Sequence, residues 1–407
     1  MNILIINQPP FNRGDESAHK GLMRAILDKM SNCQIKVLSE CRMRESVRQF
    51  NVHDKRVKYI FNPTHILGFN LCKKIGLKYN LKLFWFLHPT FAKYKSIYKW
   101  ADLVLCAPGG ICMGGFQDWE HLFLLNLAKF YGKPLVYYGR SFGPFPIVTK
   151  DNRLFKRESL KMLRYFSFLS IRERKSEELA ESLNIPFIST TDSAFLDNPK
   201  VQIPYELKYV LGNKKYMVFV PNYLLWHYAY RGKINHDTVL HFYCEIIDKV
   251  WLKDPSLNIV MLPQTFCMDD YSINDLALFR DIANIKNDTR IIVAADCYSS
   301  DIQQTIISDA EFVIGGRYHS IVFAINQAVP VIALSYEHKM AGLMQTVGLN
   351  DYYIDFREVL VSKDNRERCL NQIGVILEKL KPTFEAQKIA KNKALSCFEM
   401  FVEKFYL

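Results

Sequence analysis

Short runs of apolar residues alternate along this chain with segments of helical periodicity. Segments with helical spacing include residues 117–130, 176–183 and 238–251. A short apolar run bounded by turn residues is typical of a strand that is buried on both faces. Such runs cover residues 3–6, 103–107, 135–138, 166–171, 216–220, 258–262, 291–294, 312–314 and 331–334. The alternation predicts an α/β fold in which crossover helices connect the strands of parallel sheets.

The pattern lapses once, between residues 197 and 212, where the chain is irregular and contains Pro204. We therefore predict two Rossmann-like domains, an N-terminal one over residues 1–198 and a C-terminal one over residues 199–380. The remaining segment, residues 381–407, has the spacing of one long helix that we expect to pack back on the first domain. Ligands of open parallel sheets bind beyond the carboxyl ends of the strands, so the loops that follow strands are the places to look for chemistry.

Composition excludes several classes of protein. The chain has 407 residues, of which 49% are hydrophobic and 23% charged, a balance that excludes disordered, collagenous and coiled-coil chains. The net charge of +12 is unevenly spread. Residues 55–101 contain ten basic residues and no acidic residue, so the rest of the chain nets only +2. This is a nearly neutral protein with one basic segment.

That basic segment, residues 55–101, is also rich in aromatic residues. It allows two interpretations: a basic, aromatic surface that rests on an anionic membrane, or a surface insertion whose aromatic side chains pack inward. No recognisable nucleic-acid-binding module is present, so we expect no nucleic-acid partner. The interleaved residues are Lys73, Lys74, Lys78, Lys82, Lys93, Lys95 and Lys99 with Phe84, Trp85, Phe86, Phe91, Tyr94, Tyr98 and Trp100.

The ten cysteines show no Cys-x-x-Cys pair and no spacing typical of a zinc site, so we expect reduced, mostly buried thiols and no metal. The N-terminus lacks the features of a signal peptide, and no apolar run approaches the ~20 residues that span a bilayer. The sequence predicts a cytoplasmic protein, peripheral on the inner face of the membrane if the basic segment binds lipid.

Several loops that follow strands carry candidate chemistry. Residues 12–17 include Gly14 and Asp15; either Asp15 or Ser17 can cap the helix that follows, whose free N–H groups suit an anion. Residues 107–115 contain four glycines, among them Gly109 and Gly110, which allow a close approach of backbone or ligand. Residues 139–144 form a third glycine loop. Each of these alone is also consistent with an ordinary turn.

Three further loops carry cations. Arg172 ends a strand and can grip a phosphate or carboxylate, or pair with Glu173 at the surface. Gly315-Gly316-Arg317-Tyr318-His319 follows another strand and opens a helix, so that a helix N-terminus, a guanidinium and an imidazole can meet at one anion. Lys339, beyond the next strand, offers a point charge for a phosphate or is a solvated helix-start lysine.

Taken in order, these loops resemble the polysaccharide pyruvyltransferase family over about residues 1–350. The chain departs from the family pattern at Arg140, Glu173 and Tyr318, which leaves the reaction class intact but makes Arg140 and Glu173 weak candidates for essential groups. The motifs that carry the resemblance are RGDESAHK at residues 13–20, APGG at 107–110, GRSFGPF at 139–145, IRERKS at 171–176, TDSAF at 191–195 and GRYHS at 316–320, with AVPV at 328–331, SYEHK at 335–339 and GL at 348–349.

The resemblance implies two Rossmann-like domains facing a cleft, as in GT-B enzymes, and transfer of the pyruvyl group of phosphoenolpyruvate to two hydroxyls of a sugar as a cyclic ketal. By resemblance, Arg172, Arg317, Tyr318 and Lys339 bind phosphoenolpyruvate and His319 is the acid/base. Gly14, Asp15, Gly109 and Gly110 are expected to bind the acceptor, such as a lipid-diphosphate-linked oligosaccharide. No cofactor or metal is expected; the oligomeric state is left open.

Two alternatives remain at this point. A GT-B glycosyltransferase that uses a nucleotide sugar would also place cations and helix N-termini in its second domain. A non-catalytic basic protein that binds a membrane or nucleic acid would rely on residues 55–101.

Overall fold

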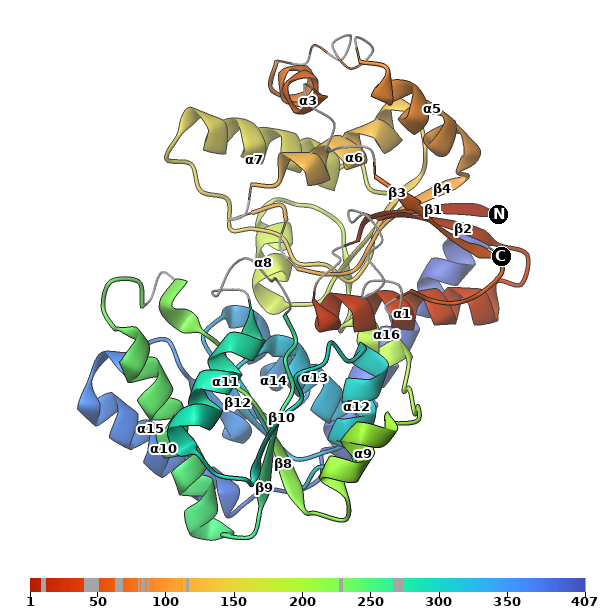
Figure 1. The fold of residues 1–407 in the computed structure, drawn as a ribbon. Helices are drawn as coiled ribbons and strands as arrows, with labels where there is room; N and C mark the ends of the chain where they lie inside the picture. The colour runs from red at the N-terminus through yellow and green to blue at the C-terminus, as the bar shows by residue number, and fades with distance from the viewer. Residues whose placement is uncertain are drawn as a thin grey trace. The chain divides into compact units, whose positions relative to one another are not determined.

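The computed structural model describes residues 1–8, 12–39, 51–62, 69–79, 81, 85, 88–110, 112–114, 117–226, 230–265 and 274–406. The chain forms two compact units. Unit 1 consists of residues 1–10, 18–197 and 393–407, and unit 2 of residues 11–17 and 198–392. Each unit contains one sheet with helices around it (Figure 1).

The sheet of unit 1 has seven parallel strands in the order β3-β2-β1-β4-β5-β6-β7. Chain order reverses between β1 and β4, which makes the carboxyl ends of these two strands the switch point where open sheets bind ligands. The strands are β1 (Asn2–Gln8), β2 (Gln34–Ser39), β3 (Val57–Phe61), β4 (Leu103–Cys106), β5 (Leu135–Tyr137), β6 (Phe168–Ile171) and β7 (Ile188–Ser189).

Both faces of this sheet are buried, as an apolar run of consecutive residues requires. Along β1, Leu4 and Ile6 point into one hydrophobic cluster, whereas Ile3 and Ile5 point into the other. Helices α5, α6 and α7 cover the first face, and α1 with the end of α16 covers the second (Figure 1). The helices of unit 1 are α3 (Phe69–Lys78), α5 (Thr90–Trp100), α6 (Trp119–Phe130), α7 (Lys150–Leu163), α8 (Arg174–Ser182) and the 3₁₀ helix η2 (Ser193–Leu196).

The sheet of unit 2 repeats the arrangement with six parallel strands in the order β10-β9-β8-β11-β12-β13. Its switch point lies at the carboxyl ends of β8 and β11. The strands are β8 (Tyr216–Val220), β9 (Asn258–Met261), β10 (Ile291–Val293), β11 (Val313–Gly315), β12 (Val331–Ser335) and β13 (Tyr353–Asp355).

Helices surround the second sheet in the same manner. Those of unit 2 are α9 (Tyr205–Leu211), α10 (His236–Lys253), α11 (Asp275–Lys286), α12 (Ser300–Ser308), α13 (Tyr318–Asn326), α14 (His338–Thr346) and α15 (Lys363–Leu377), with the 3₁₀ helices η3 (Leu224–Trp226), η5 (Asn350–Tyr352) and η6 (Val359–Val361). Two helices pass from one unit to the other along the chain: α1 (Arg13–Lys29) begins in unit 2, and α16 (Phe384–Phe405) ends in unit 1.

The predicted fold class, two parallel α/β sheets and a long C-terminal helix, is confirmed. The expectation for the cysteines also agrees with the described part of the chain, where seven cysteines form no disulfide and five of them are buried. No helix within the described residues is long and apolar enough to cross a membrane.

The basic segment is partly described, and there its aromatic residues face inward. Trp85, Phe91, Tyr94 and Tyr98 are buried in a hydrophobic cluster of unit 1, and Lys73 pairs with Glu120 in the same region. Inward packing accounts for these four rings, so they are not a surface available to lipid. Lys82, Phe84 and Phe86 lie outside the described residues. Lys93, Lys95 and Lys99 are exposed, so a purely electrostatic contact with an anionic membrane stays a prediction.

Candidate functional site

The loop after β11 places three of the predicted residues at the switch point of unit 2. Gly315 and Gly316 let helix α13 start close to the sheet: a Cβ on Gly315 would lie 2.2 Å from Ser320 Oγ, and one on Gly316 would lie 3.2 Å from the backbone nitrogen of Asn222. Arg317 has extended backbone at the N-cap of α13, and no side chain caps this helix. Its N-terminal amides are therefore suited to an anion.

Arg317 is held by a buried carboxylate, Asp275, which is 1% exposed. Arg317 Nε donates to Asp275 Oδ1 at 3.1 Å and Nη2 donates to the same oxygen. Asp275 Oδ2 accepts from the backbone N–H groups of Gln264 and Thr265. Burial lowers the pKa of the Arg317 guanidinium, but Asp275 and the nearby Tyr336 outweigh it and raise the pKa above its usual value, so the charge is permanent.

His319 lies in the first turn of α13 and is 7% exposed. Its ring contacts the Tyr318 ring edge-on, with centroids 4.9 Å apart. On another side it meets the backbone of Gly14, because a Cβ placed on Gly14 would lie 1.7 Å from His319 Nδ1. Only glycine fits there, so the position of the imidazole depends on a residue three hundred positions earlier in the chain.

This contact yields a prediction for Gly14→Ala. The added methyl group must displace the His319 ring, and a misplacement of about 1 Å costs on the order of 10²-fold in rate. We expect kcat to fall about 10²-fold while the melting temperature changes little. The control is Gly374→Ala, whose new Cβ meets only the flexible end of Lys249. Equal activities of the two variants would remove Gly14 from the site.

The start of α1 belongs to unit 2, where two of its residues, Arg13 and Glu16, make buried polar contacts. Arg13, 1% exposed, forms an ion pair with Glu16 at 2.9 Å and donates to the Cys297 carbonyl at 3.0 Å. Glu16 accepts from the backbone N–H and the hydroxyl of Ser300, each at 3.0 Å. Burial lowers the pKa of Arg13, partly offset by Glu16. Residues 11–17 fall within the predicted first domain, whereas the structure groups them with unit 2.

The cap of α1 differs from the sequence prediction. Asn12, and neither Asp15 nor Ser17, caps the helix: its Oδ1 accepts from the N–H groups of Gly14 at 2.7 Å and of Asp15 at 3.4 Å. Asn is as good an N-cap as Asp, and it stands one residue before the helix begins. Asp15 is half-buried, and the Ser17 hydroxyl accepts instead from Gln304.

Lys339 and Tyr318 are both half-buried. Lys339 Nζ lies 3.0 Å from Glu337 Oε2 in the first turn of α14, so part of its charge is already balanced within the protein. Tyr336 precedes this pair; burial raises the pKa of its hydroxyl, and the Arg317 guanidinium opposes that rise. Tyr336 therefore keeps its proton near neutral pH.

Gly109 and Gly110 lie in unit 1, at the carboxyl end of β4. The buried side chain of Arg140 organises their loop: it donates to the carbonyls of Ala107 at 2.5 Å, Gly110 at 3.3 Å and Asn7 at 3.3 Å. Arg140 is fully buried, so its role here is to hold the backbone of the loop. Arg140 was a weak candidate for an essential group by its departure from the family pattern, and its contacts indicate a structural role.

Arg172 lies in unit 1 at the end of β6, where its buried side chain forms an ion pair with the fully buried Asp192. Glu173, which the sequence suggested as an alternative partner at the surface, is itself buried and caps α8 by accepting from the N–H groups of Lys175 and Ser176. A buried arginine with a carboxylate partner is typical of both structural pairs and anion sites.

The Arg172–Asp192 pair gives a second prediction. Asp192→Ala removes the carboxylate that pairs with the buried Arg172 guanidinium and should lower the free energy of unfolding by about 3–5 kcal/mol. Urea unfolding of the double variant Arg172→Met/Asp192→Leu should recover most of this loss, since apolar pairs often replace buried ion pairs without cost. If Arg172 also binds the donor, the double variant is stable but inactive. A double variant as unstable as the single one would contradict this account.

The structure thus brings Gly14, Arg317, Tyr318 and His319 together in unit 2 and places Arg172, Gly109 and Gly110 in unit 1. Asp275 was missed by the sequence analysis. It carries no local motif: it is one acidic residue in the first turn of α11, and its distance in sequence from Arg317 hides the pairing.

Comparisons with known proteins identify the family and the relatives that this chain resembles. The profile of the family described as polysaccharide pyruvyl transferase matches residues 31–338. The amylovoran biosynthesis protein AmsJ of Erwinia amylovora is 22% identical over 97% of this chain and 98% of its own length.

Among solved structures, the UDP-GlcNAc 2-epimerase of Neisseria meningitidis bound to UDP-GlcNAc has a TM-score of 0.57 at 12% identity and covers 99% of this chain and 100% of its own. Phytolacca americana UGT2, in complex with UDP-2-fluoro-glucose and pterostilbene, has a TM-score of 0.55 at 11% identity, with all of both chains covered. These likenesses show a fold similar to that of GT-B enzymes. The family match covers about three quarters of the sequence, and the chain belongs to the polysaccharide pyruvyl transferase family.

Proposed function

We propose that this enzyme transfers the pyruvyl group of phosphoenolpyruvate to two hydroxyls of one sugar and forms a cyclic ketal during the biosynthesis of a polysaccharide. Family membership and the relative in amylovoran biosynthesis support pyruvyl transfer to a polysaccharide. The observation that carries the choice of donor is Arg317, a permanent cation fixed by buried Asp275 beside His319 at the switch point of unit 2.

Asp275 engages only part of the N–H groups of the Arg317 guanidinium. Its Nε and Nη2 are directed to Asp275, and in the described part of the protein Nη1 makes no hydrogen bond. An arginine that is oriented from one side and open on the other is suited to a phosphate or carboxylate. Phosphoenolpyruvate carries both groups, and the uncapped N-terminus of α13 supplies further N–H donors next to the same guanidinium. Tyr318, Lys339 and Arg172 stay predicted ligands of the donor.

In the proposed reaction, the two sugar hydroxyls lose their protons and both protons end in the products. Protonation of C3 turns the enol phosphate into a cation at C2, and one sugar oxygen bonds to C2. The bond between C2 and the phosphate oxygen then breaks, and the second sugar oxygen closes the ketal. One hydroxyl proton ends on C3 and the other on the released phosphate. His319 is the group proposed to carry the proton, since imidazole both accepts and donates one near neutral pH.

The acceptor is proposed to be a sugar of a polysaccharide repeat, such as one linked to a lipid diphosphate. Gly14, Asp15, Gly109 and Gly110 stay its predicted contacts. Gly14 lies against the proposed proton carrier, which is consistent with a hydroxyl arriving beside His319.

The test is to incubate the protein with phosphoenolpyruvate and a panel of acceptor glycans. The expected result is release of inorganic phosphate together with a glycan heavier by pyruvate minus water. A matched thermal titration compares phosphoenolpyruvate with nucleotide sugars. Stabilisation by a nucleotide sugar alone, without phosphate release from phosphoenolpyruvate, would overturn the proposal in favour of a glycosyltransferase.

A further inference from the structure

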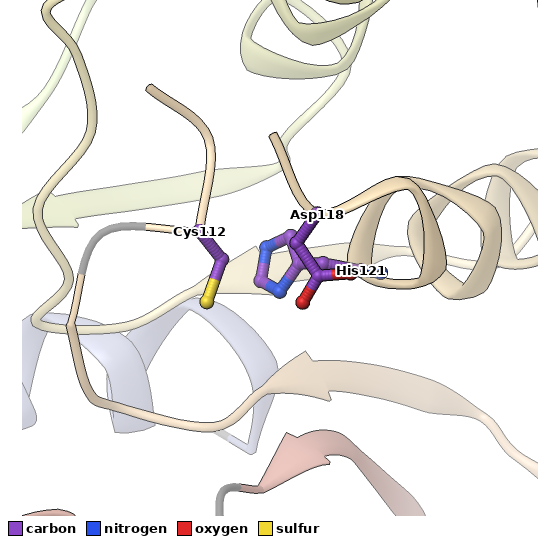
Figure 2. Close-up of side chains that lie close together, drawn as sticks. All are labelled: Cys112, Asp118 and His121. Atoms are coloured by element: carbon purple, nitrogen blue, oxygen red, sulfur yellow. Dashed lines mark hydrogen bonds between the residues drawn. The ribbon is translucent and has the colours of Figure 1, made fainter. Parts of the chain in front are cut away.

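Three side chains of different ligand chemistry meet at the switch point of unit 1, beside the loop that Arg140 holds. The Cys112 sulfur, a carboxylate oxygen of Asp118 and a ring nitrogen of His121 all lie within 4.8 Å of one another. Figure 2 shows the three side chains turned toward the same space, with Cys112 and Asp118 on the loop after β4 and His121 in the first turn of α6. Neither the family resemblance nor the proposed mechanism uses them.

From this geometry we infer a binding site for a divalent cation of the zinc class, held by Cys112, Asp118 and His121. Thiolate, imidazole and carboxylate are the three ligand types that Zn²⁺ accepts, with bonds of ~2.0–2.3 Å, so ligand atoms this close together can share one ion. Three protein ligands leave the fourth tetrahedral position open for water or a substrate oxygen. The switch point of an open sheet is also where such sheets bind ligands.

The surroundings of the three ligands orient them for this role. Asp118 caps α6: its Oδ1 accepts from the His121 N–H at 3.0 Å, and its other oxygen makes no hydrogen bond in the described part of the protein. His121 is buried, and its Nε2 lies 3.9 Å from the Cys106 sulfur. Contacts of this kind fix the orientation of metal-binding side chains.

Arg140 is a charged neighbour of the three ligands and repels a cation. Its Nη2 lies 3.0 Å from the Cys112 sulfur. A thiolate and a carboxylate that hold Zn²⁺ bring negative charge to the ion, which offsets this repulsion.

The metal alone tests the site, without any substrate, so the result is independent of the proposed reaction. The full chain is stripped with a chelator, reduced, and titrated with Co²⁺. We expect a near-ultraviolet band from thiolate-to-cobalt charge transfer that one equivalent of Zn²⁺ removes. Cys112→Ser should abolish the band, while Cys33→Ala, a change of another buried cysteine of unit 1, should keep it.

Asp118→Asn separates the metal role from the helix cap. Asn caps as well as Asp, so α6 and the melting temperature of the metal-free protein should be unchanged, whereas the affinity for Zn²⁺ should fall at least tenfold because the charged ligand is lost. The site is overturned if the wild-type protein shows no charge-transfer band, or if the band persists in Cys112→Ser. Either outcome would leave Cys112 as a hydrogen-bonding partner of Arg140 only.

Discussion

His319→Ala is expected to abolish pyruvyl transfer while the protein stays folded. General acid–base groups contribute about 10²–10⁴-fold to rate, and His319 lies in the first turn of the helix that Arg317 begins at this switch point. The loss should appear in kcat, measured as phosphate release from phosphoenolpyruvate in the presence of acceptor. Binding of phosphoenolpyruvate should be weakened much less, because the donor's charges are met by Arg317 and the start of α13.

The matched control is His241→Ala, since His241 is exposed on α10. A fold readout is needed because the His319 ring packs against Tyr318, and circular dichroism with a thermal melt supplies it. His319→Asn retains part of the side-chain volume and a hydrogen-bonding group but cannot relay a proton, so it should be as inactive as His319→Ala. Activity within tenfold of wild type in either variant would remove His319 from the proton transfer.

Asp275→Ala should damage both stability and donor binding. It leaves Arg317 buried without its carboxylate, and removing one partner of such a pair costs about 3–5 kcal/mol. It also leaves the N–H groups of Gln264 and Thr265 without their acceptor, at a further cost of about 1–3 kcal/mol each where they stay dry. Urea unfolding measures the first effect. The KM for phosphoenolpyruvate measures the second, because an unheld Arg317 loses its orientation.

Two further variants make this prediction specific. Asp275→Asn keeps an oxygen for the two N–H groups but loses the charge, so it should recover part of the stability and little of the donor affinity. Asp281 lies on the same helix, and its side chain is 39% exposed. Asp281→Ala should therefore leave the free energy of unfolding nearly unchanged. If Asp275→Ala is no more destabilising than Asp281→Ala, the buried pair does not organise the site.

The sequence was informative about the sheets wherever strands are buried on both faces. Residues 3–6 and 216–220 are uninterrupted apolar runs, and both are strands. Strand β3 was not predicted, because Val57–Phe61 includes Lys58 and lies at the edge of its sheet, where half-exposed residues weaken the pattern. Helix α6 begins at Trp119 rather than at 117, because the cap Asp118 fixes its start.

The sequence predicts the part of the site whose residues are neighbours along the chain. Arg317 and His319 follow a glycine turn and are neighbours in sequence, so a strand, a turn and a helix place them together. Asp275 comes from a different loop, and Gly14 contacts His319 from the opposite end of the chain; only the tertiary fold joins them. Cys112, Asp118 and His121 match no zinc spacing in the sequence; Asp118 and His121 are neighbours at the start of α6, and only the tertiary structure brings Cys112 to them.

The division of α1 and α16 between the two units limits how this protein can be cut. A fragment of residues 198–407 would lack residues 11–17, so the Ser300 N–H and hydroxyl would lose their acceptor Glu16, and the backbone of Gly14 would no longer hold the imidazole of His319. A fragment of residues 1–197 would lack Cys397, Phe398, Phe401 and Val402, which fill one face of its sheet. Neither unit is therefore one continuous segment of the chain. A protein that contains one complete unit would have to join segments that lie far apart in the sequence, and no single truncation achieves that.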